Sequence, residues 1–301
     1  MIKSSKKKRR NKDNLVGYLF ILPALIGFIG FILLPFIISF ILSFTQWNFI
    51  SGLSGIKFVG LSNFKELLTD IWFTDSLKNN IIFTFTVVPI SLIVGLILAV
   101  LIQKYTYFSN CIKVMIFMSY ISSVVAIAVV WMVLLQPSYG PVNQFLVSIG
   151  ITTPPQWLAD MKWSLPTLIF ITIWQGIGYY VIIFIGGLNS ISESIYESAE
   201  IDGANFWKKL WCISVPLVSP TTFFLAITGI IHSFKVFDLV SVLTEGGPGT
   251  STTVLAYYIY KSAFKYNRMG YASAIAWIVF IIIFVITIVQ WKGQKKLVTY
   301  E

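Results

Sequence analysis

Charged residues are scarce in this chain of 301 residues: Asp, Glu, Lys and Arg make up 11% of it, whereas 56% is hydrophobic. A soluble domain carries roughly 25% charged residues. A chain of this length also cannot enclose so much apolar surface in a single core. The composition therefore excludes an ordinary soluble domain and predicts a polytopic membrane protein whose surplus apolar surface faces lipid.

The residues that usually build catalytic, metal or nucleotide sites are few as well. The sequence holds one histidine, His232, and two cysteines, Cys111 and Cys212. A single histidine cannot support a Ser–His–Asp or Cys–His arrangement, and no metal site is expected. The sequence also contains no G-x-x-x-x-G-K-[ST] loop, the motif that cradles the phosphates of ATP. We therefore expect neither an enzyme nor a chain that itself binds a cofactor.

Long apolar runs take the place of these motifs. Six uncharged stretches are long enough to cross roughly 30 Å of hydrocarbon as helices. They lie near residues 16–42, 81–102, 114–135, 165–187, 217–237 and 271–290. Pro23 and Pro35 predict a kinked or tilted first helix. The six runs together predict an all-α fold of six transmembrane helices.

These runs contain almost no ionisable side chains. Ion-coupled transporters usually place such groups within the bilayer, because a moving ion needs a polar partner there. Their scarcity weakens the case for secondary transport. It favours a transporter whose energy source lies outside this polypeptide.

The basic residues indicate an orientation rather than a nucleic-acid partner. The net charge is +10, but seven of the 22 Lys and Arg residues lie in residues 3–12, directly before the first apolar run. With both termini in the cytoplasm, 14 basic residues would lie inside and 8 outside, as the positive-inside rule prefers. We therefore expect that topology and no nucleic-acid binding. Cys111 and Cys212 would then face the cytoplasm, where thiols stay reduced. The uncharged stretch of residues 15–44 is 30 residues long, beyond the roughly 7–15 residues of a signal-peptide core, so no cleaved signal peptide is expected.

One cytoplasmic connection, residues 188–216, has an unusual composition. Four of the twelve acids of the chain fall within residues 193–202. Ser190 and Glu193 have the spacing of a capping box at the start of a helix, and Gly203 follows where a helix C-terminus needs a positive φ. A second short helix, ANFWKKLWCI, is expected to end before Pro216.

This connection has two interpretations. An amphipathic segment on the lipid surface would direct Lys208 and Lys209 towards anionic headgroups, but that surface would repel the acids. A protein partner accounts for both features, since Trp207 and Leu210 would serve as apolar anchors and the acids would pair with a basic cleft. We therefore interpret the connection as a docking plug for a protein.

The same segment resembles a known family. ESAEIDGA, followed by ISVPLVSP, resembles the EAA loop of permease subunits in binding-protein-dependent ABC importers, in the form typical of the branch for maltose, oligosaccharides and glycerol phosphate. The stretches GYLFILPALIGFIGFILLPFIISFILSFTQWN and FVGLSNF resemble its first span and first external loop. FDLVSVLTEGGPGTSTTVLAYYIYKSAFKYNRMGYASA resembles its last external loop and final span. The resemblance implies the transmembrane fold of type I ABC importers.

The resemblance also implies how the chain is divided. Residues 1–14 would be a basic cytoplasmic tail, 15–76 the first transmembrane helix and an external loop, 77–291 the importer transmembrane domain with its coupling loop at 188–216, and 292–301 a second tail. Carried over position by position, Glu197, Ala199 and Gly203 fill the hallmark places of the family's loop. The candidate residues of the loop that would sit in a groove on an ATPase are Glu197, Ser198, Ala199, Glu200, Asp202, Gly203, Ala204, Phe206, Trp207, Leu210 and Pro216. Alanine is usual where this chain has Ser198, a difference on the order of tenths of a kcal/mol in helix propensity.

The family further implies partners, a location and a cargo. A second, unlike permease subunit, a pair of ATPase subunits that bind ATP and magnesium, and an extracellular solute-binding protein would assemble with this chain in the bacterial cytoplasmic membrane. The assembly would import an oligosaccharide or a related carbohydrate. Two rivals stay open: an ion-coupled secondary transporter of a small polar solute, and a membrane-anchored scaffold that moves nothing.

Candidate substrate contacts are side chains of the spans that could stack on a sugar or hydrogen-bond it. They are Trp174, Gln175, Tyr179, Tyr180, Thr228, His232 and Asp238. Polar residues in membrane helices also serve helix packing, so that role stays open for each of them. Outside the membrane, EGGPGTST predicts a turn, and the resemblance implies that Gly246, Gly247 and Pro248 lie near the binding protein.

Overall fold

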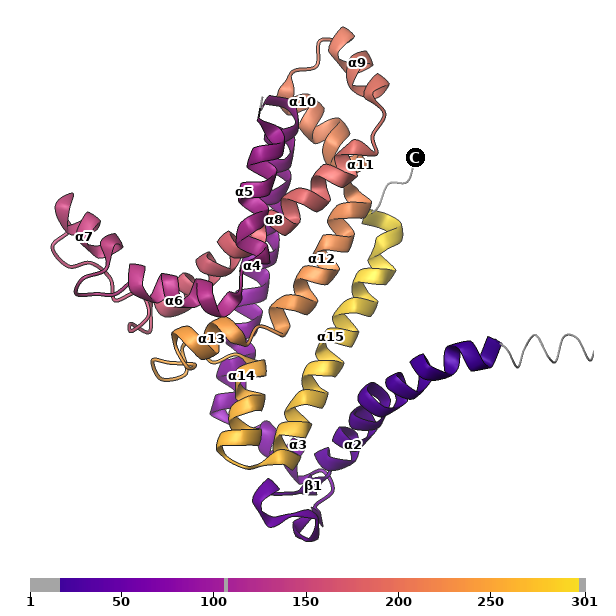
Figure 1. Ribbon diagram of the computed structural model, residues 1–301, viewed down its shortest axis with the longest axis vertical. Helices are drawn as coiled ribbons and strands as arrows, with labels where there is room; N and C mark the ends of the chain where they lie inside the picture. The colour runs from indigo at the N-terminus through magenta and orange to yellow at the C-terminus, as the bar shows by residue number, and fades with distance from the viewer. Residues whose placement is uncertain (1–16, 106–107, 298–301) are drawn as a thin grey trace, which may run out of the picture. The chain divides into compact units, whose positions relative to one another are not determined.

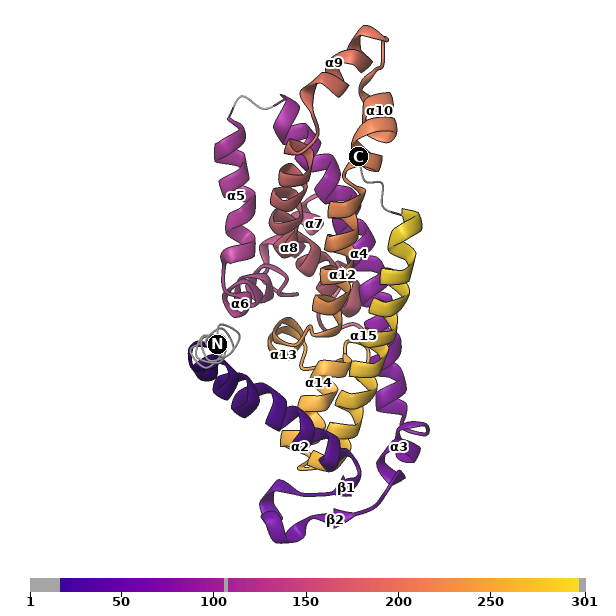
Figure 2. The same cartoon turned by 90° about the vertical axis from the view of Figure 1, so that its right-hand side faces the viewer.

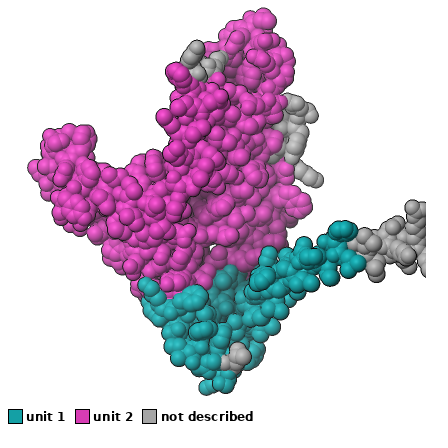
Figure 3. All heavy atoms as spheres, in the orientation of Figure 1, with its two compact units in different colours: residues 1–66, 262–277 teal, residues 67–261, 278–301 magenta. Residues whose placement is uncertain are grey.

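The computed structural model describes residues 17–105 and 108–297 (Figure 1). Apart from two strands of two residues each, every regular element of these residues is helical, which confirms the all-α prediction. The chain forms two compact units, coloured separately in Figure 3. Unit 1 comprises residues 1–66 and 262–277, and unit 2 comprises residues 67–261 and 278–301.

The first apolar helix, Gly17–Ser43, belongs to unit 1. A π-turn, η1 (Ile29–Leu33), precedes α2 (Leu34–Ser43), and the Leu34 N–H donates to the Ile29 carbonyl. Pro35 follows at once. Because proline lacks an N–H and its ring crowds the carbonyl four residues earlier, the wider turn lets the helix continue. In the most apolar 18-residue segment of this helix no residue is buried, so these side chains are available to lipid.

The remainder of unit 1 is a compact loop structure. β1 (Thr45–Gln46) pairs antiparallel with β2 (Lys57–Phe58). Two 3-10 turns, η2 (Phe49–Ser51) and η3 (Leu53–Gly55), lie between the strands, and α3 (Ser62–Leu67) follows. The Asn63 amide donates to the carbonyls of Ser43 and Thr45, both at 2.9 Å. This side chain therefore satisfies backbone groups at the end of α2.

The C-terminal segment of unit 1 packs on the same loop structure. It leaves the π-turn η5 (Lys261–Lys265) and enters α15 (Met269–Leu297). Arg268 donates to the Glu66 carboxylate at 2.6 Å and lies over the Tyr271 ring. At Gly270 a Cβ atom would lie 1.8 Å from the Thr45 carbonyl oxygen, so only glycine permits this approach.

Unit 2 is a bundle built on α4 (Ile71–Tyr105) and α8 (Ser164–Asn189), which lie side by side. α5 (Ser109–Ile121) packs on α8, while α12 (Ser219–Phe234) packs on α4 and α8 (Figures 1 and 2). α14 (Leu255–Tyr260) also contacts α4, and α6 (Val124–Leu134) contacts α13 (Asp238–Leu243). α7 (Pro141–Ser148) lies in the connection between α6 and α8.

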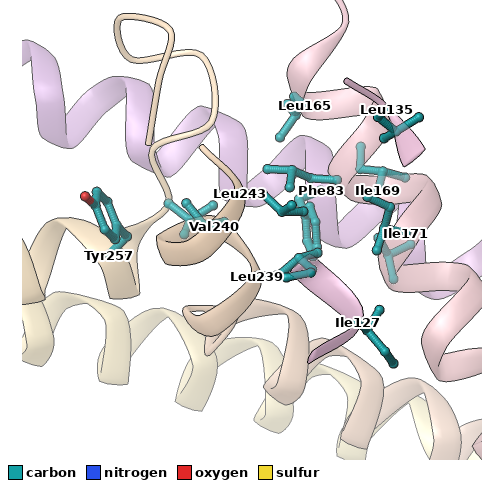
Figure 4. Packing of buried hydrophobic residues seen from close by; sticks show 14 residues of the cluster. Phe83, Ile127, Leu135, Leu165, Ile169, Ile171, Leu239, Val240, Leu243 and Tyr257 are labelled. Carbon is teal, nitrogen blue, oxygen red and sulfur yellow. The ribbon is translucent and has the colours of Figure 1, made fainter. Parts of the chain in front are cut away.

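Two clusters of buried apolar side chains hold this bundle together. In the first, Phe83 of α4 is fully buried and lies among side chains of α8 and α13, such as Ile171 and Leu239 (Figure 4). The second joins α4, α8 and α12 around Phe184 and Leu225, which are also fully buried.

The apolar runs predicted from the sequence form helices in the structure, with one correction. Within the described residues, five helices are long and apolar enough to cross a membrane, namely Gly17–Ser43, Ile71–Gln103, Ser164–Asn189, Ser219–Leu243 and Met269–Gln294. The run at 114–135 is not one straight helix, because α5 and α6 meet at 94°. Ser122 and Ser123 have ψ angles of 146° and 127°, so the backbone is extended between the two helices. Six spans result if this bent pair counts as one.

α4 begins ten residues before the predicted span, and its first turns are polar. The Asn80 side chain is fully buried. Its amide donates to the Ser233 carbonyl at 3.2 Å, and its oxygen accepts the Leu255 N–H at 2.8 Å. One side chain of α4 therefore satisfies backbone groups next to α12 and α14.

We expect Asn80→Leu to destabilise the protein by about 1–3 kcal/mol, because it removes the acceptor of the Leu255 N–H, and a buried donor without a partner costs about that much. The Ser233 carbonyl keeps a bond, since it also accepts the Val236 N–H at 3.5 Å. The melting temperature of the detergent-purified chain measures the effect. Asn110→Leu is the matched control, since Asn110 is exposed on α5 and exposed substitutions usually stay within about 0.5 kcal/mol. Equal melting temperatures for the two variants would contradict this role of Asn80.

Candidate functional site

The connection from α8 to α12 forms a projecting loop (Figure 1). It contains α9 (Glu193–Ile201), α10 (Phe206–Lys209), the π-turn η4 (Leu210–Ser214) and α11 (Val215–Leu217). The sequence predicted the coupling loop at 188–216; in the structure the connection spans residues 190–218, and the name coupling loop is used for this range from here on. α8 leads into it and α12 leads out of it, so both of its ends continue into helices of the bundle.

Two local predictions for this loop are wrong. Ser190 does not cap α9: its hydroxyl donates back to the Gly187 carbonyl at the end of α8, and Ser192 is the N-cap. The second helix also does not end before Pro216. The Val215 N–H donates to the Leu210 carbonyl across η4, and this wider turn accommodates the proline ring.

The prediction for Gly203 is confirmed, since its φ is 73°. The Gly203 N–H donates to the Glu200 carbonyl at 3.0 Å, and the Ala204 N–H donates to the Ala199 carbonyl at 2.8 Å. These two bonds form a Schellman motif, which ends a helix on a residue with positive φ. The Asn205 side chain then accepts the Lys208 N–H and caps α10. The chain therefore reverses between α9 and α10 through a defined turn.

The polar candidates of the loop face solvent. Glu197, Ser198, Glu200 and Asp202 are exposed. The Ser198 hydroxyl donates to the Ser194 carbonyl of the same helix at 2.8 Å, so the serine that replaces the usual alanine is accommodated within α9. Two carboxylates, those of Glu197 and Asp202, are therefore presented on the outer part of the loop.

The apolar candidates separate into outward and inward side chains. Trp207 is 60% exposed and Leu210 is 4% exposed, whereas Phe206 and Pro216 are partly buried. Sequence reasoning missed Ile201, which is 87% exposed at the end of α9. Ile201, Trp207 and Trp211, which is 63% exposed, are therefore the large apolar side chains that the loop offers to another molecule, and Leu210 belongs to its interior.

Five of the seven candidate substrate contacts line one hollow of about 490 Å³ in unit 2. These five are Gln175, Tyr179, Tyr180, His232 and Asp238. The walls come from α4, α5, α8, α12 and α13. We call this space the central hollow.

The other two candidates lie outside the central hollow. Trp174 is 43% exposed and packs edge-on against Trp131 at 5.6 Å. The Thr228 hydroxyl donates to the Phe224 carbonyl of its own helix at 2.9 Å.

An aromatic wall and several polar groups define the central hollow. Tyr120 and Tyr179 stack at 5.1 Å with an angle of 27° between their rings. Lys235 and Asp238 are exposed at the lining. Ser91 lines the same space, and its buried hydroxyl oxygen has no hydrogen-bond partner among the residues that the structure describes. Stacked rings beside polar groups suit a ligand that has both apolar faces and hydroxyl groups.

Tyr120, Ser91 and Lys235 were not predicted as lining residues. Tyr120 lies at the end of α5 and Ser91 lies within a continuous apolar run. A motif or a local period cannot place them beside α8, because the juxtaposition depends on how the helices pack.

The glycine-rich segment 245–252 forms the tight turn that its composition predicts. Gly246 and Gly249 have φ angles of 82° and 61°. The Asn79 amide donates to the carbonyls of Thr250 and Thr253 at 2.7 and 2.9 Å. Gly246 is buried, while Gly247 and Pro248 are partly buried. α4 therefore holds this turn in place, and the expected contact of its three residues with a binding protein stays a prediction.

The helical fold and the apolar spans define a multi-pass membrane protein. A family model described as "Binding-protein-dependent transport system inner membrane component" matches residues 73–292. The chain belongs to this family. It is thus a transport subunit rather than an enzyme, and the resemblance noted in the coupling loop is confirmed.

Individual relatives agree with this assignment. The chain is 34% identical over 301 residues to the probable ABC transporter permease protein YesP of Bacillus subtilis (strain 168), covering 98% of this chain and 96% of that protein. It is 32% identical to the lactose transport system permease protein LacF of Rhizobium radiobacter, with 98% and 99% covered. The crystal structure of a bacterial ABC transporter involved in the import of the acidic polysaccharide alginate contains a chain of the same fold. The TM-score is 0.86 at 24% identity, and 98% of this chain and 100% of that chain are covered.

Proposed function

We propose that this chain is one of two permease subunits of an ATP-driven importer in the bacterial cytoplasmic membrane. The importer translocates an oligosaccharide or a related carbohydrate that an extracellular solute-binding protein delivers. The observation that carries the proposal is the coupling loop. It is a projecting, solvent-exposed segment inserted between α8 and α12, and both helices line the central hollow.

The surface of the loop supports docking to a separate ATPase. Ile201 and Trp207 expose large apolar side chains, and Trp211 of η4 is 63% exposed. Apolar anchors that are surrounded by charged groups are typical of protein interfaces. The exposed carboxylates of Glu197 and Asp202 suit a basic groove. The ATP and magnesium that drive transport would be bound by that partner.

The central hollow supports a carbohydrate as cargo. The stacked rings of Tyr120 and Tyr179 offer an aromatic face, while Gln175, His232 and Asp238 offer hydrogen-bonding groups. Sugars present both apolar C–H faces and hydroxyl groups, so they can use both kinds of wall. The lactose permease LacF, 32% identical to this chain, supports the same cargo class.

The mechanism follows from the connection between the two sites. ATP binding would close the ATPase pair and displace the coupling loops that are seated in it. The loop is attached to α8 at one end and to α12 at the other. α8 contributes Gln175 and Tyr179 to the central hollow, and α12 contributes His232. A displacement of the loop would therefore reach two walls of the central hollow and change its access. Hydrolysis would reset the assembly.

Reconstitution tests this function. Proteoliposomes that contain this chain, its partner permease and the ATPase should accumulate labelled maltooligosaccharide only with ATP on the ATPase side and binding protein on the other. A protonophore should not alter the rate. Uptake by the permease subunits without the ATPase, abolished by the protonophore, would contradict the proposal and identify an ion-coupled transporter instead.

Two residues predicted from the sequence as substrate contacts differ in their location: Tyr179 lines the central hollow and Thr228 does not. We expect Tyr179→Leu to lower uptake about tenfold at subsaturating substrate, because losing about 1.4 kcal/mol of stacking corresponds to that factor. Thr228→Val should leave uptake within about twofold, since helical Thr228 lies outside the hollow and its variant loses a local bond worth about 1 kcal/mol or less. Initial uptake rates in the same proteoliposomes measure both. Equal losses for the two variants would contradict this location of the substrate path.

A further inference from the structure

An ion pair joins the two arms of the coupling loop. The Lys209 ammonium lies 2.5 Å from the Glu200 carboxylate, and the side chains are 10% and 57% exposed, respectively. A lysine ammonium that is largely removed from water requires a counter-charge. Sequence reasoning had assigned Glu200 to the ATPase, but the structure gives it a partner in the same loop.

The ion pair lies at the opposite end of α9 from other contacts that attach this helix to the protein. Near its start, Ile195 and Tyr196 pack against the second apolar cluster, and the hydroxyls of Tyr196 and Ser214 lie 2.9 Å apart. Glu200 lies in the last turn of α9, next to the chain reversal at Gly203. The pair therefore fixes the far end of α9 to the end of α10.

α9 borders a hollow inside the loop. A hollow of about 550 Å³ lies between the loop and the ends of α4 and α8, and both Glu200 and Lys209 line it. A helix above such a space can be pushed inward unless something braces it. The ion pair spans one side of this hollow.

α10 continues from Lys209 through η4 and α11 into α12. α12 carries Gly229, His232 and Ser233 to the central hollow. A displacement of α9 that is transmitted through the ion pair would therefore move α12, the helix that lines the substrate path.

We propose that Glu200 and Lys209 are positioning residues that make the two arms of the coupling loop move as one body. Displacement of α9 by the ATPase is then passed to α12 and the central hollow rather than lost in deformation of the loop. The inference rests on the proposed function and adds to it an internal brace that acts after docking.

Lys209→Met and Glu200→Gln remove the brace, Lys209→Arg keeps its charge, and Lys208→Met is the matched control on the exposed neighbour. Each variant is compared with the wild type in the same reconstituted importer. Two quantities are measured: uptake of labelled maltooligosaccharide, and retention of the ATPase on the immobilised permease pair. Lys209→Met and Glu200→Gln should retain the ATPase but lower uptake about fivefold or more, the lower end of the range for coupled sites. Lys209→Arg and Lys208→Met should stay within about twofold of the wild type, below that range.

The other outcomes separate the two proposals. If Lys209→Met lowers uptake no more than Lys208→Met, or if Lys209→Met and Glu200→Gln lose the ATPase, the brace is refuted. In the second case the pair shapes the docking surface instead of transmitting motion. If the wild-type assembly shows no ATP-dependent uptake, the proposed function itself fails.

Discussion

Replacing Gly203 with proline is expected to leave the chain in the membrane but to lower uptake at least about tenfold, within the range that coupled sites show. The φ of Gly203 is 73°, whereas proline fixes φ near −65°. The substitution also deletes the N–H that donates to the Glu200 carbonyl. The reversal between α9 and α10 would then open, and the loop would no longer present one docking surface.

Uptake and ATP hydrolysis in proteoliposomes measure this effect, together with the amount of inserted protein. Hydrolysis by the ATPase should continue while less solute is moved per ATP. Gly203→Asn is the matched control, because asparagine tolerates a positive φ better than other non-glycine residues, and it should retain most of the uptake. Unimpaired uptake in Gly203→Pro would refute the role of this turn.

Gly178→Ala is expected to destabilise the protein by about 1–3 kcal/mol, the usual range for overpacking. A Cβ at Gly178 would lie 2.4 Å from the Ile116 carbonyl oxygen and 2.9 Å from the Phe117 Cα. These are backbone atoms of α5, so no side chain can rotate away. The two helices would have to separate, and α5 and α8 both line the central hollow.

Gly186→Ala provides the control within the same helix. A Cβ at Gly186 would meet nothing within 4 Å, and alanine is favoured over glycine in a helix interior by about 1 kcal/mol. The two substitutions should therefore shift the melting temperature in detergent in opposite directions, Gly178→Ala downward and Gly186→Ala upward or not at all. A shift of the same sign and size for both would contradict the close approach of α5 and α8.

Features that depend on local chemistry could be predicted from the sequence. The apolar runs located the spans, because a helix in hydrocarbon must be long and uncharged whatever it packs against. Gly203 was predicted correctly because the Schellman turn imposes a positive φ on one residue. The composition of EGGPGTST likewise predicted a turn, and Gly246 and Gly249 have positive φ there.

Features that depend on packing could not be predicted in the same way. The bend between α5 and α6 lies within an uninterrupted uncharged run, where Ser122 and Ser123 give only a weak local signal. The pair between Glu200 and Lys209 joins residues nine apart across a chain reversal, a spacing that no helix or strand period indicates. Trp174 and Thr228 lie outside the central hollow, a location that depends on helix rotation and that composition does not indicate.

We propose above all that a separate ATPase binds the coupling loop from the cytoplasm. A cysteine placed at Ile201, which is 87% exposed, tests it most directly in a chain whose exposed Cys111 and Cys212 are replaced by serine. A membrane-impermeant thiol reagent should label this cysteine only from the cytoplasmic side, and addition of the ATPase should protect it. Labelling only from the extracellular side, or labelling that the ATPase leaves unchanged, would contradict the account.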